Sequence, residues 1–267
     1  MVPLFESESS KLDGGCYRVD DGEGSAIHVL HGFQRHMSSG AQDQPALYAD
    51  TIWPGAVAVA ERLAAEPDLV RGLSVLEVGC GQHALPALVA AVVGAKSVLA
   101  TDHPKSGVVA TLPFVVLENA LTHVVSVSVL DWEDRGEEGG VVLAGAGAER
   151  EAEAGAGAGF VCVPARIPQT GFDVIIAAEC LWKDTRRLHE PLAALVTSRA
   201  ASRARLIVSW GDRLTADHTA AHNRAFVDRL VDTHGWREES AAATEEVDLL
   251  QEGGGHVRVH LVVLQRG

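Results

Sequence analysis

The sequence repeatedly places a short apolar run before a turn and a helix. Residues 74–78 (SVLEV) form such a run, which ends in the glycine-rich turn at residues 79–81. Residues 85–93 then have the continuous apolar character of a buried helix. A strand that is apolar throughout is typical of a parallel sheet, because helices cover both of its faces. This unit therefore predicts an α/β fold.

The same unit recurs along the chain. Further strands are predicted at residues 97–101, 124–130, 172–178 and 205–210, and helices at residues 54–66, 112–121, 185–198 and 215–233. Near the end, two strand-like runs at residues 245–250 and 256–264 flank three glycines, which is typical of a hairpin. The pattern predicts a doubly wound, mostly parallel seven-stranded sheet with a C-terminal antiparallel hairpin.

The chain divides into an N-terminal extension, residues 1–45, and one domain over residues 46–267. In the extension, the apolar runs at residues 16–19 and 26–30 are predicted to pair as a hairpin. Residues 135–159 consist mainly of Gly, Ala and Glu and show no apolar face. We expect this stretch to be a flexible surface insertion between the third and fourth strands.

The composition excludes several classes of protein. With 36 acidic and 22 basic residues, the formal net charge of -14 opposes a phosphate backbone, so we expect no nucleic-acid partner. The longest apolar run, residues 84–93, is too short to span a bilayer, and no N-terminal leader pattern is present. Four cysteines without paired metal spacing predict reduced thiols and no zinc site. We expect a monomeric cytoplasmic protein that does not bind membranes.

Residues suited to ligand binding follow the first two predicted strands, at the edge where doubly wound sheets bind ligands. Glu77 lies in the first strand, and Gly79, Cys80 and Gly81 form a turn that allows close backbone approach before a helix N-terminus. Such a turn also serves nicotinamide and flavin cofactors, or tight packing alone. Asp102 follows the second strand, where its carboxylate can accept both hydroxyl protons of a ribose or, alternatively, cap a turn.

The third and fourth predicted strands end in acidic and aromatic residues. Asp131 and Trp132 could contact an adenine ring, through its exocyclic amine and its face respectively. Beyond the fourth strand lie Ala178, Glu179 and Trp182, where an acid can hold an incoming amine and an aromatic ring can stack on a cation. Ordinary packing of the tryptophans and a surface glutamate are the alternatives. Together these residues predict a nucleoside ligand with a second substrate beside it.

Four segments, in this order, resemble the class I, seven-β-strand protein-lysine methyltransferase family, which includes fungal members named after nicotinamide N-methyltransferase. They are TIWPGAVAVAERL (51–63), VLEVGCGQHALPALVAAVVGAKSVLATDHP (75–104), VLDWED (129–134) and FDVIIAAECLW (172–182). The resemblance covers about residues 48–210. It implies a Rossmann-like methyltransferase fold, S-adenosyl-L-methionine (SAM) as cofactor, and N-methylation of a lysine side chain on a protein substrate.

The resemblance also implies roles for individual residues. The positions that match the family's cofactor site are Trp53, Glu77, Gly79, Cys80, Gly81, Asp102, Asp131, Trp132 and Ala178. Glu179 and Trp182 match the family's acid-x-x-aromatic motif at the substrate amine and are the predicted catalytic pair. The sulfonium makes the methyl group electrophilic, so the protein's task is mainly to align a neutral amine with it.

Two parts of the sequence depart from the family pattern. The third glycine of the cofactor loop is replaced around Gln82, His83 and Ala84, and Glu179 and Trp182 stand where Asp and Tyr or Phe are common. Three alternatives therefore stay open. They are a small-molecule, nicotinamide-like N-methyltransferase, a non-catalytic interaction protein on the same fold, and a nicotinamide-dependent dehydrogenase, which the missing third glycine disfavours.

Overall fold

The computed structural model describes most of the predicted domain and two short N-terminal strands. The described residues are 16–18, 26–28, 52–133, 140–142, 163–165, 171–181, 183–212, 220–239, 243–248 and 256–267.

Five parallel strands form the centre of the main sheet. In chain order they are β3 (Ser74–Val78), β4 (Ser97–Asp102), β5 (Val125–Val129), β8 (Phe172–Ala178) and β9 (Ala200–Gly211). Their spatial order is β5-β4-β3-β8-β9, so β3 pairs with β4 on one side and β8 on the other. The strand order therefore reverses between β3 and β8, which is where doubly wound sheets bind ligands.

The C-terminal side of the sheet is antiparallel. Strand β12 (His256–Arg266) pairs with β9, and its other edge pairs with two short strands in succession, β11 (Ala243–Asp248) and β10 (Trp236–Glu238). The predicted fold class is confirmed, including the hairpin of β11 and β12. One difference is that the edge position holds two strands, so this sheet contains eight. The sequence analysis missed β10 because three residues are too few to show a period.

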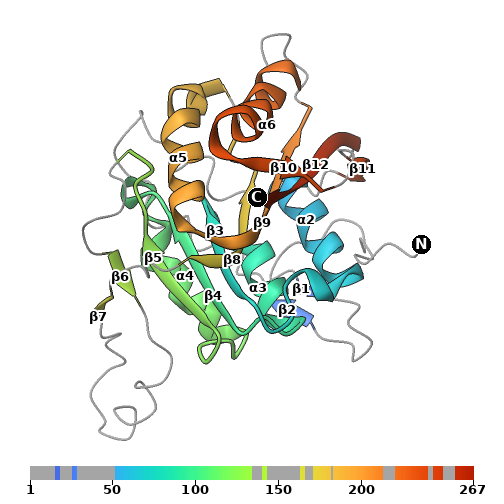
Figure 1. The fold of residues 1–267 in the computed structure, drawn as a ribbon. Helices are drawn as coiled ribbons and strands as arrows, with labels where there is room; N and C mark the ends of the chain where they lie inside the picture. Colours follow the sequence, from blue (N-terminus) through green and yellow to red (C-terminus); the bar gives the residue numbers. More distant parts are fainter. Residues whose placement is uncertain are drawn as a thin grey trace, which may run out of the picture.

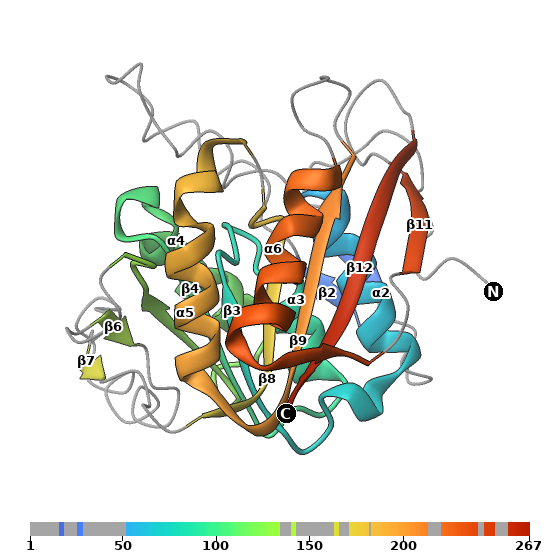
Figure 2. The ribbon, with the colours of Figure 1, turned by 45° about the horizontal axis from the view of Figure 1, so that its top comes forward.

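Helices cover both faces of the sheet (Figures 1 and 2). One face packs against α2 (Pro54–Ala65), α3 (Leu85–Val92) and α4 (Val108–Glu118), and the other against α5 (His189–Arg199) and α6 (Ala220–His234). Neighbouring strand residues serve opposite faces, since Val75 packs on the α2–α4 side and Leu76 on the α5–α6 side. The three-layer arrangement explains why the central strands are mainly apolar on both faces.

The predicted helices occur with shifted ends. Helix α4 begins at Val108 rather than 112 and contains Pro113 in its interior, whereas proline normally favours the first turn. The helix predicted from residue 185 begins instead as the 3-10 helix η6 (Lys183–Leu188) and continues as α5. The short 3-10 helices η2 (Pro67–Leu69) and η3 (Pro104–Ser106) complete the described helices.

Two small hairpins lie outside the main sheet. Strand β1 (Cys16–Arg18) pairs with β2 (Ala26–His28) in antiparallel register, as the sequence predicted. Strand β6 (Gly140–Val142) pairs with β7 (Val163–Ala165) and lies within residues 135–159, where no strand was expected. The other residues of that insertion lie outside the described part, so the division into domains stays a prediction. No helix in the described part is long and apolar enough to cross a membrane.

His189 is a buried titratable residue in the layer of α5 and α6. Its side chain packs edge-on against Phe226, with ring centroids 5.5 Å apart, and its Nε2 has no hydrogen-bond partner among the described residues. Burial and then the nearby Arg229 and Arg186 lower the pKa of His189 from 6.5 to about 4. The folded protein therefore holds this imidazole neutral above that pH.

We expect the free energy of unfolding to depend on His189 between pH 4 and 6.5. In this window the unfolded chain binds a proton on the residue and the folded chain does not, so stability falls as the pH is lowered. His189→Leu should flatten that part of the curve, whereas replacing the exposed His123 by Leu should not. Urea unfolding across the window measures the effect, and parallel curves for His189→Leu and wild type would contradict it.

Candidate functional site

The glycine turn after β3 is held against the neighbouring strand. Gly79 and Gly81 have φ of +66° and +63°, in the left-handed region that glycine adopts without a steric cost. Between them, the Cys80 N–H donates to the carbonyl oxygen of Thr101 in β4 at 3.0 Å. The turn therefore requires glycines and bends its backbone towards the end of β4.

Two side chains from other strands pack on this turn. A Cβ on Gly79 would lie 3.0 Å from Cys180 Sγ and 3.2 Å from Trp132 Cζ2, so a larger residue would collide with both. The Cys180 thiol donates to the carbonyl oxygen of Val78 at 3.1 Å. Burial raises the pKa of the Cys180 thiol well above its usual value, as it does for Cys80, so neither is suited to act as a nucleophile. The half-buried Trp132 lies beside the turn, and its contact with an adenine ring stays a prediction.

Asp102 connects the turn to the end of β4. Its side chain is 8% exposed; Oδ2 accepts from the Gly81 N–H and Oδ1 from the His103 N–H, both at 2.8 Å. Burial raises the pKa of Asp102, and its hydrogen bonds, those to Gly81 and His103 among them, oppose that shift. The Ser106 side chain also donates to this carboxylate. A carboxylate has about four acceptor sites, so these three bonds leave capacity for one ribose hydroxyl.

Asp131 lies at the same edge, half-buried, after β5. Its Oδ1 accepts from the Glu133 N–H at 2.9 Å, which closes a turn, and its Oδ2 lies 3.7 Å from His103 Nε2. The side chain is thus directed towards the loop that follows β4.

Glu77 has a contact that the sequence analysis did not anticipate. Its carboxylate is 1% exposed, and Oε2 accepts from the Ala87 N–H in the first turn of α3 at 2.9 Å. The N-cap residue of this helix, Ala84, has φ of +43° and provides no side-chain cap, so Glu77 takes that role from the strand. Burial raises the pKa of Glu77 well above its usual value. Its assignment as a cofactor residue stays a prediction.

Glu179 lies on the other side of the turn, directly after Ala178 at the end of β8. Its φ of +55° is unusual for a residue other than glycine and costs conformational energy. The side chain is 9% exposed, and its Oε1 accepts from the Gly55 N–H at 2.9 Å. Gly55 is the second residue of α2, so the carboxylate lies at the positive end of that helix.

The remaining predicted residues have different outcomes. Trp53 is the N-cap residue of α2, and its carbonyl oxygen accepts from the N–H groups of Ala56 and Val57. It therefore lies two residues from the backbone contact of Glu179. Trp182 lies outside the described residues, so its predicted pairing with Glu179 stays a prediction.

Two further residues contact Glu179 and were not identified from the sequence. Gly55 donates to its carboxylate, and Ser209 accepts from its backbone N–H at 2.9 Å. Pro54 at the helix start indicates that the next N–H lacks a partner within the helix. No local pattern singles out Ser209, because its contact depends on how distant segments meet.

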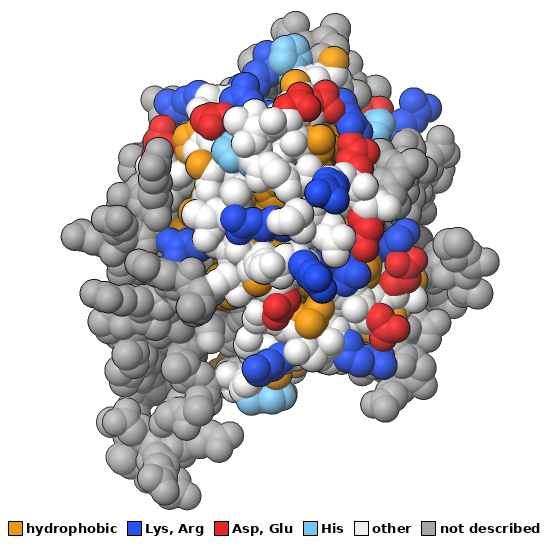
Figure 3. Space-filling view, viewed as in Figure 1, with side chains coloured by type: hydrophobic (Ala, Val, Ile, Leu, Met, Phe, Trp, Pro, Cys, Tyr) orange, Lys and Arg blue, Asp and Glu red, His pale blue; other side chains and the backbone are white. Residues whose placement is uncertain are grey.

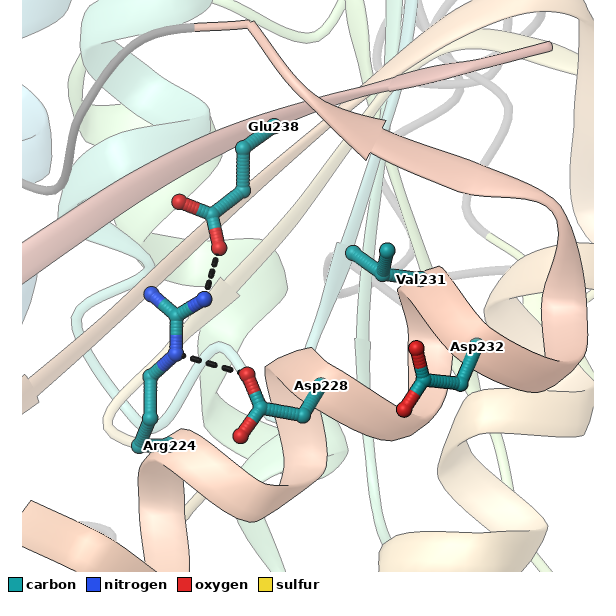
Figure 4. A pocket seen from close by; sticks show the side chains of 5 residues that line it. All are labelled: Arg224, Asp228, Val231, Asp232 and Glu238. Atoms are coloured by element: carbon teal, nitrogen blue, oxygen red, sulfur yellow. Dashed lines mark hydrogen bonds and ion pairs between the residues drawn. The ribbon is translucent and has the colours of Figure 1, made fainter.

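A separate hollow lies between α6 and β10 (Figure 4). It is lined by Arg224, Asp228, Val231, Asp232 and Glu238, none of which belongs to the predicted site. Arg224 donates to Asp228 at 2.8 Å and also to Glu238, so its charge is paired within the hollow. In the face shown in Figure 3, acidic and basic side chains are interspersed. The described residues contain no cluster of three or more potential metal ligands.

Comparison with curated proteins gives short but specific matches. The chain is 44% identical over 63 residues to the protein N-terminal and lysine N-methyltransferase efm7 of Neurospora crassa, and 40% identical over 70 residues to EFM7 of Eremothecium gossypii. These matches cover 24% and 26% of this chain and 22% and 26% of the relatives. The chain thus spans about a quarter of the length of the curated relatives it matches. No family model matches it.

Solved structures resemble the whole fold. PH1948 from Pyrococcus horikoshii, described as a proposed RNA methyltransferase, matches with a TM-score of 0.52 at 13% identity, over 85% of this chain and 91% of its own. SMU.776, described as a proposed methyltransferase complexed with SAH, has a TM-score of 0.52 at 11% identity, over 96% and 57%. The chain therefore has the class I methyltransferase fold, and about a quarter of its sequence is similar to the protein N-terminal and lysine N-methyltransferases EFM7.

Proposed function

We propose that this protein is a SAM-dependent N-methyltransferase that acts on a lysine side chain of a protein substrate. The observation that carries the proposal is the placement of the buried acids Asp102 and Glu179 at one sheet edge. Asp102 is the last residue of β4 and Glu179 directly follows β8, and these two strands pair with the two sides of β3. The similarity to lysine methyltransferases supports the choice of acceptor.

The residues on the Asp102 side fit a nucleoside. Asp102 would accept from a ribose hydroxyl, the turn from Gly79 to Gly81 would let the ligand approach the backbone closely, and Trp132 would cover the base. The close packing of Trp132 against Gly79 holds the indole ring beside the turn. SAM, when bound there, supplies a methyl group on a positively charged sulfur.

The residues on the Glu179 side would handle the amine. The carboxylate would accept a hydrogen bond from the lysine nitrogen and turn its lone pair towards the methyl group. The amine must lose a proton before it attacks, and water at the site mouth would take that proton. No protein nucleophile is needed, which agrees with the buried, neutral state of Cys80 and Cys180.

The overall charge agrees with a basic protein substrate rather than a nucleic acid. A formal net charge of -14 attracts lysine-rich segments over long range and repels phosphate backbones. We also propose that the protein is a monomer and that it acts in the cytoplasm, where its cysteines would stay reduced.

We expect saturable binding of SAM and no binding of NADH in calorimetric titrations of the purified protein. Asp102→Ala should weaken SAM binding by about ten-fold or more, because hydrogen bonds to a charged group contribute about 1.5–3 kcal/mol. The exposed carboxylate Asp68 provides a control, since Asp68→Ala removes a charge from η2, which contributes no residue to the candidate site. A folded wild-type protein that binds no SAM would contradict the proposal and favour a non-catalytic interaction protein.

We expect Glu179→Gln to lower kcat by roughly five-fold or more while SAM affinity stays near that of wild type. The amide keeps an oxygen that can accept from the Gly55 N–H but loses the charge that strengthens a hydrogen bond to the amine. Transfer of a labelled methyl group to proteins of a cell extract measures turnover, and calorimetry measures SAM binding. Equal losses in turnover and affinity would contradict a substrate role for Glu179.

A further inference from the structure

Three residues from distant parts of the chain form a closed ring of hydrogen bonds beside the candidate site. The Gly55 N–H donates to Glu179 Oε1, the Glu179 N–H donates to the carbonyl oxygen of Ser209, and the Ser209 hydroxyl donates to the carbonyl oxygen of Gly55. Each of the three distances is 2.9 Å. The ring thereby joins the start of α2, the end of β8 and the strand β9.

The Glu179 carboxylate is closely packed on two sides, against Gly55 and against Gly211. A Cβ on Gly55 would lie 2.8 Å from both Cγ and Oε1 of Glu179, and 2.9 Å from Ser209 Oγ. A Cβ on Gly211 would lie 3.1 Å from the same Oε1. Glycines at these two positions therefore allow the carboxylate to fit, and Ser209, at 0% exposed, is sealed beneath it.

The backbone of Glu179 also requires support from its surroundings. Its φ of +55° is a strained conformation for a residue with a side chain, and such residues persist only where neighbouring groups fix them. The bond from the Glu179 N–H to Ser209 fixes the backbone, and the bond from Gly55 fixes the carboxylate. Strained residues of this kind cluster at functional sites.

We propose that Ser209 is a positioning residue, which sets the orientation of the Glu179 carboxylate through Gly55. Its hydroxyl donates to the carbonyl oxygen of Gly55 and so fixes the backbone of that residue. The N–H of the same residue donates to Oε1 of Glu179. The two oxygens of a carboxylate are fixed relative to each other, so the hydrogen bond that holds Oε1 also sets the direction in which Oε2 points. This inference rests on the proposed function, in which Glu179 orients the substrate amine.

The test compares two buried serines of the same sheet. Ser209→Ala removes the hydroxyl that closes the ring, and Ser128→Ala removes one that donates only to the adjacent carbonyl of Val129 in β5. Both side chains are 0% exposed, so the two variants lose similar buried groups. We expect Ser209→Ala to lower kcat roughly ten-fold, because small displacements of an orienting group are costly. The Kd for SAM should change by less than about two-fold in both variants.

The outcomes separate the two hypotheses. An active wild type with an unchanged kcat in Ser209→Ala would overturn the positioning role alone. Equal kcat losses in Ser209→Ala and Ser128→Ala, or a parallel loss of SAM affinity in Ser209→Ala, would assign the effect to general packing and also overturn it. A wild-type protein that binds SAM but methylates no protein in extract would overturn the proposed acceptor, and the positioning role with it.

A second measurement follows the ring without any substrate. In the full chain, hydrogen exchange at the Gly55 amide should become roughly ten-fold faster in Ser209→Ala than in wild type, because the bond to Glu179 opens more often. Ser128→Ala should leave that rate unchanged. An unaltered Gly55 rate in Ser209→Ala would show that Ser209 does not fix the contact, and would overturn the inference independently of activity.

Discussion

The pairing of β3 with β4 on one edge and with β8 on the other is the constraint on which the site depends. Because these strands are parallel, their carboxyl ends emerge side by side, with the glycine turn in the middle. Asp102 ends β4 on one side, and Glu179 follows β8 on the other. The reversal of strand order thus provides two acidic positions on either side of the turn, at the edge where doubly wound sheets bind ligands.

The three buried acids of this edge share a second task, which is to accept backbone N–H groups of neighbouring segments. Glu77 binds the start of α3, Asp102 binds the glycine turn, and Glu179 binds the start of α2. Neither helix has a side-chain cap of its own, since the N-cap residues are Ala84 and Trp53. The strands therefore supply the caps, and each helix is oriented by an acid of the site.

The sequence could predict where these acids lie, but not which backbone N–H groups they accept from. Strands β3 and β8 were predicted with their observed bounds, because each is mainly apolar and ends at a turn. The position of Glu179 followed from β8, and that of Asp102 from the predicted strand that corresponds to β4. The capping contact of Glu77 and the ring through Ser209 did not, since hydrogen bonds between residues far apart in sequence depend on the packed helices. Periodicity identifies faces and ends, but not which donor meets which acceptor.

Acids that cap a helix and also face a substrate complicate the reading of substitutions. Replacement by alanine removes the cap and the charge together, so a loss of activity could come from a displaced helix. Replacement by the amide keeps one oxygen as an acceptor for the backbone N–H and removes only the charge. For Glu179 the ring is a third factor, because the same ring of hydrogen bonds holds both its strained backbone and its carboxylate. The proposed role of Glu179 at the substrate and its role in placing α2 are therefore separated by changing the charge, the cap and the ring one at a time.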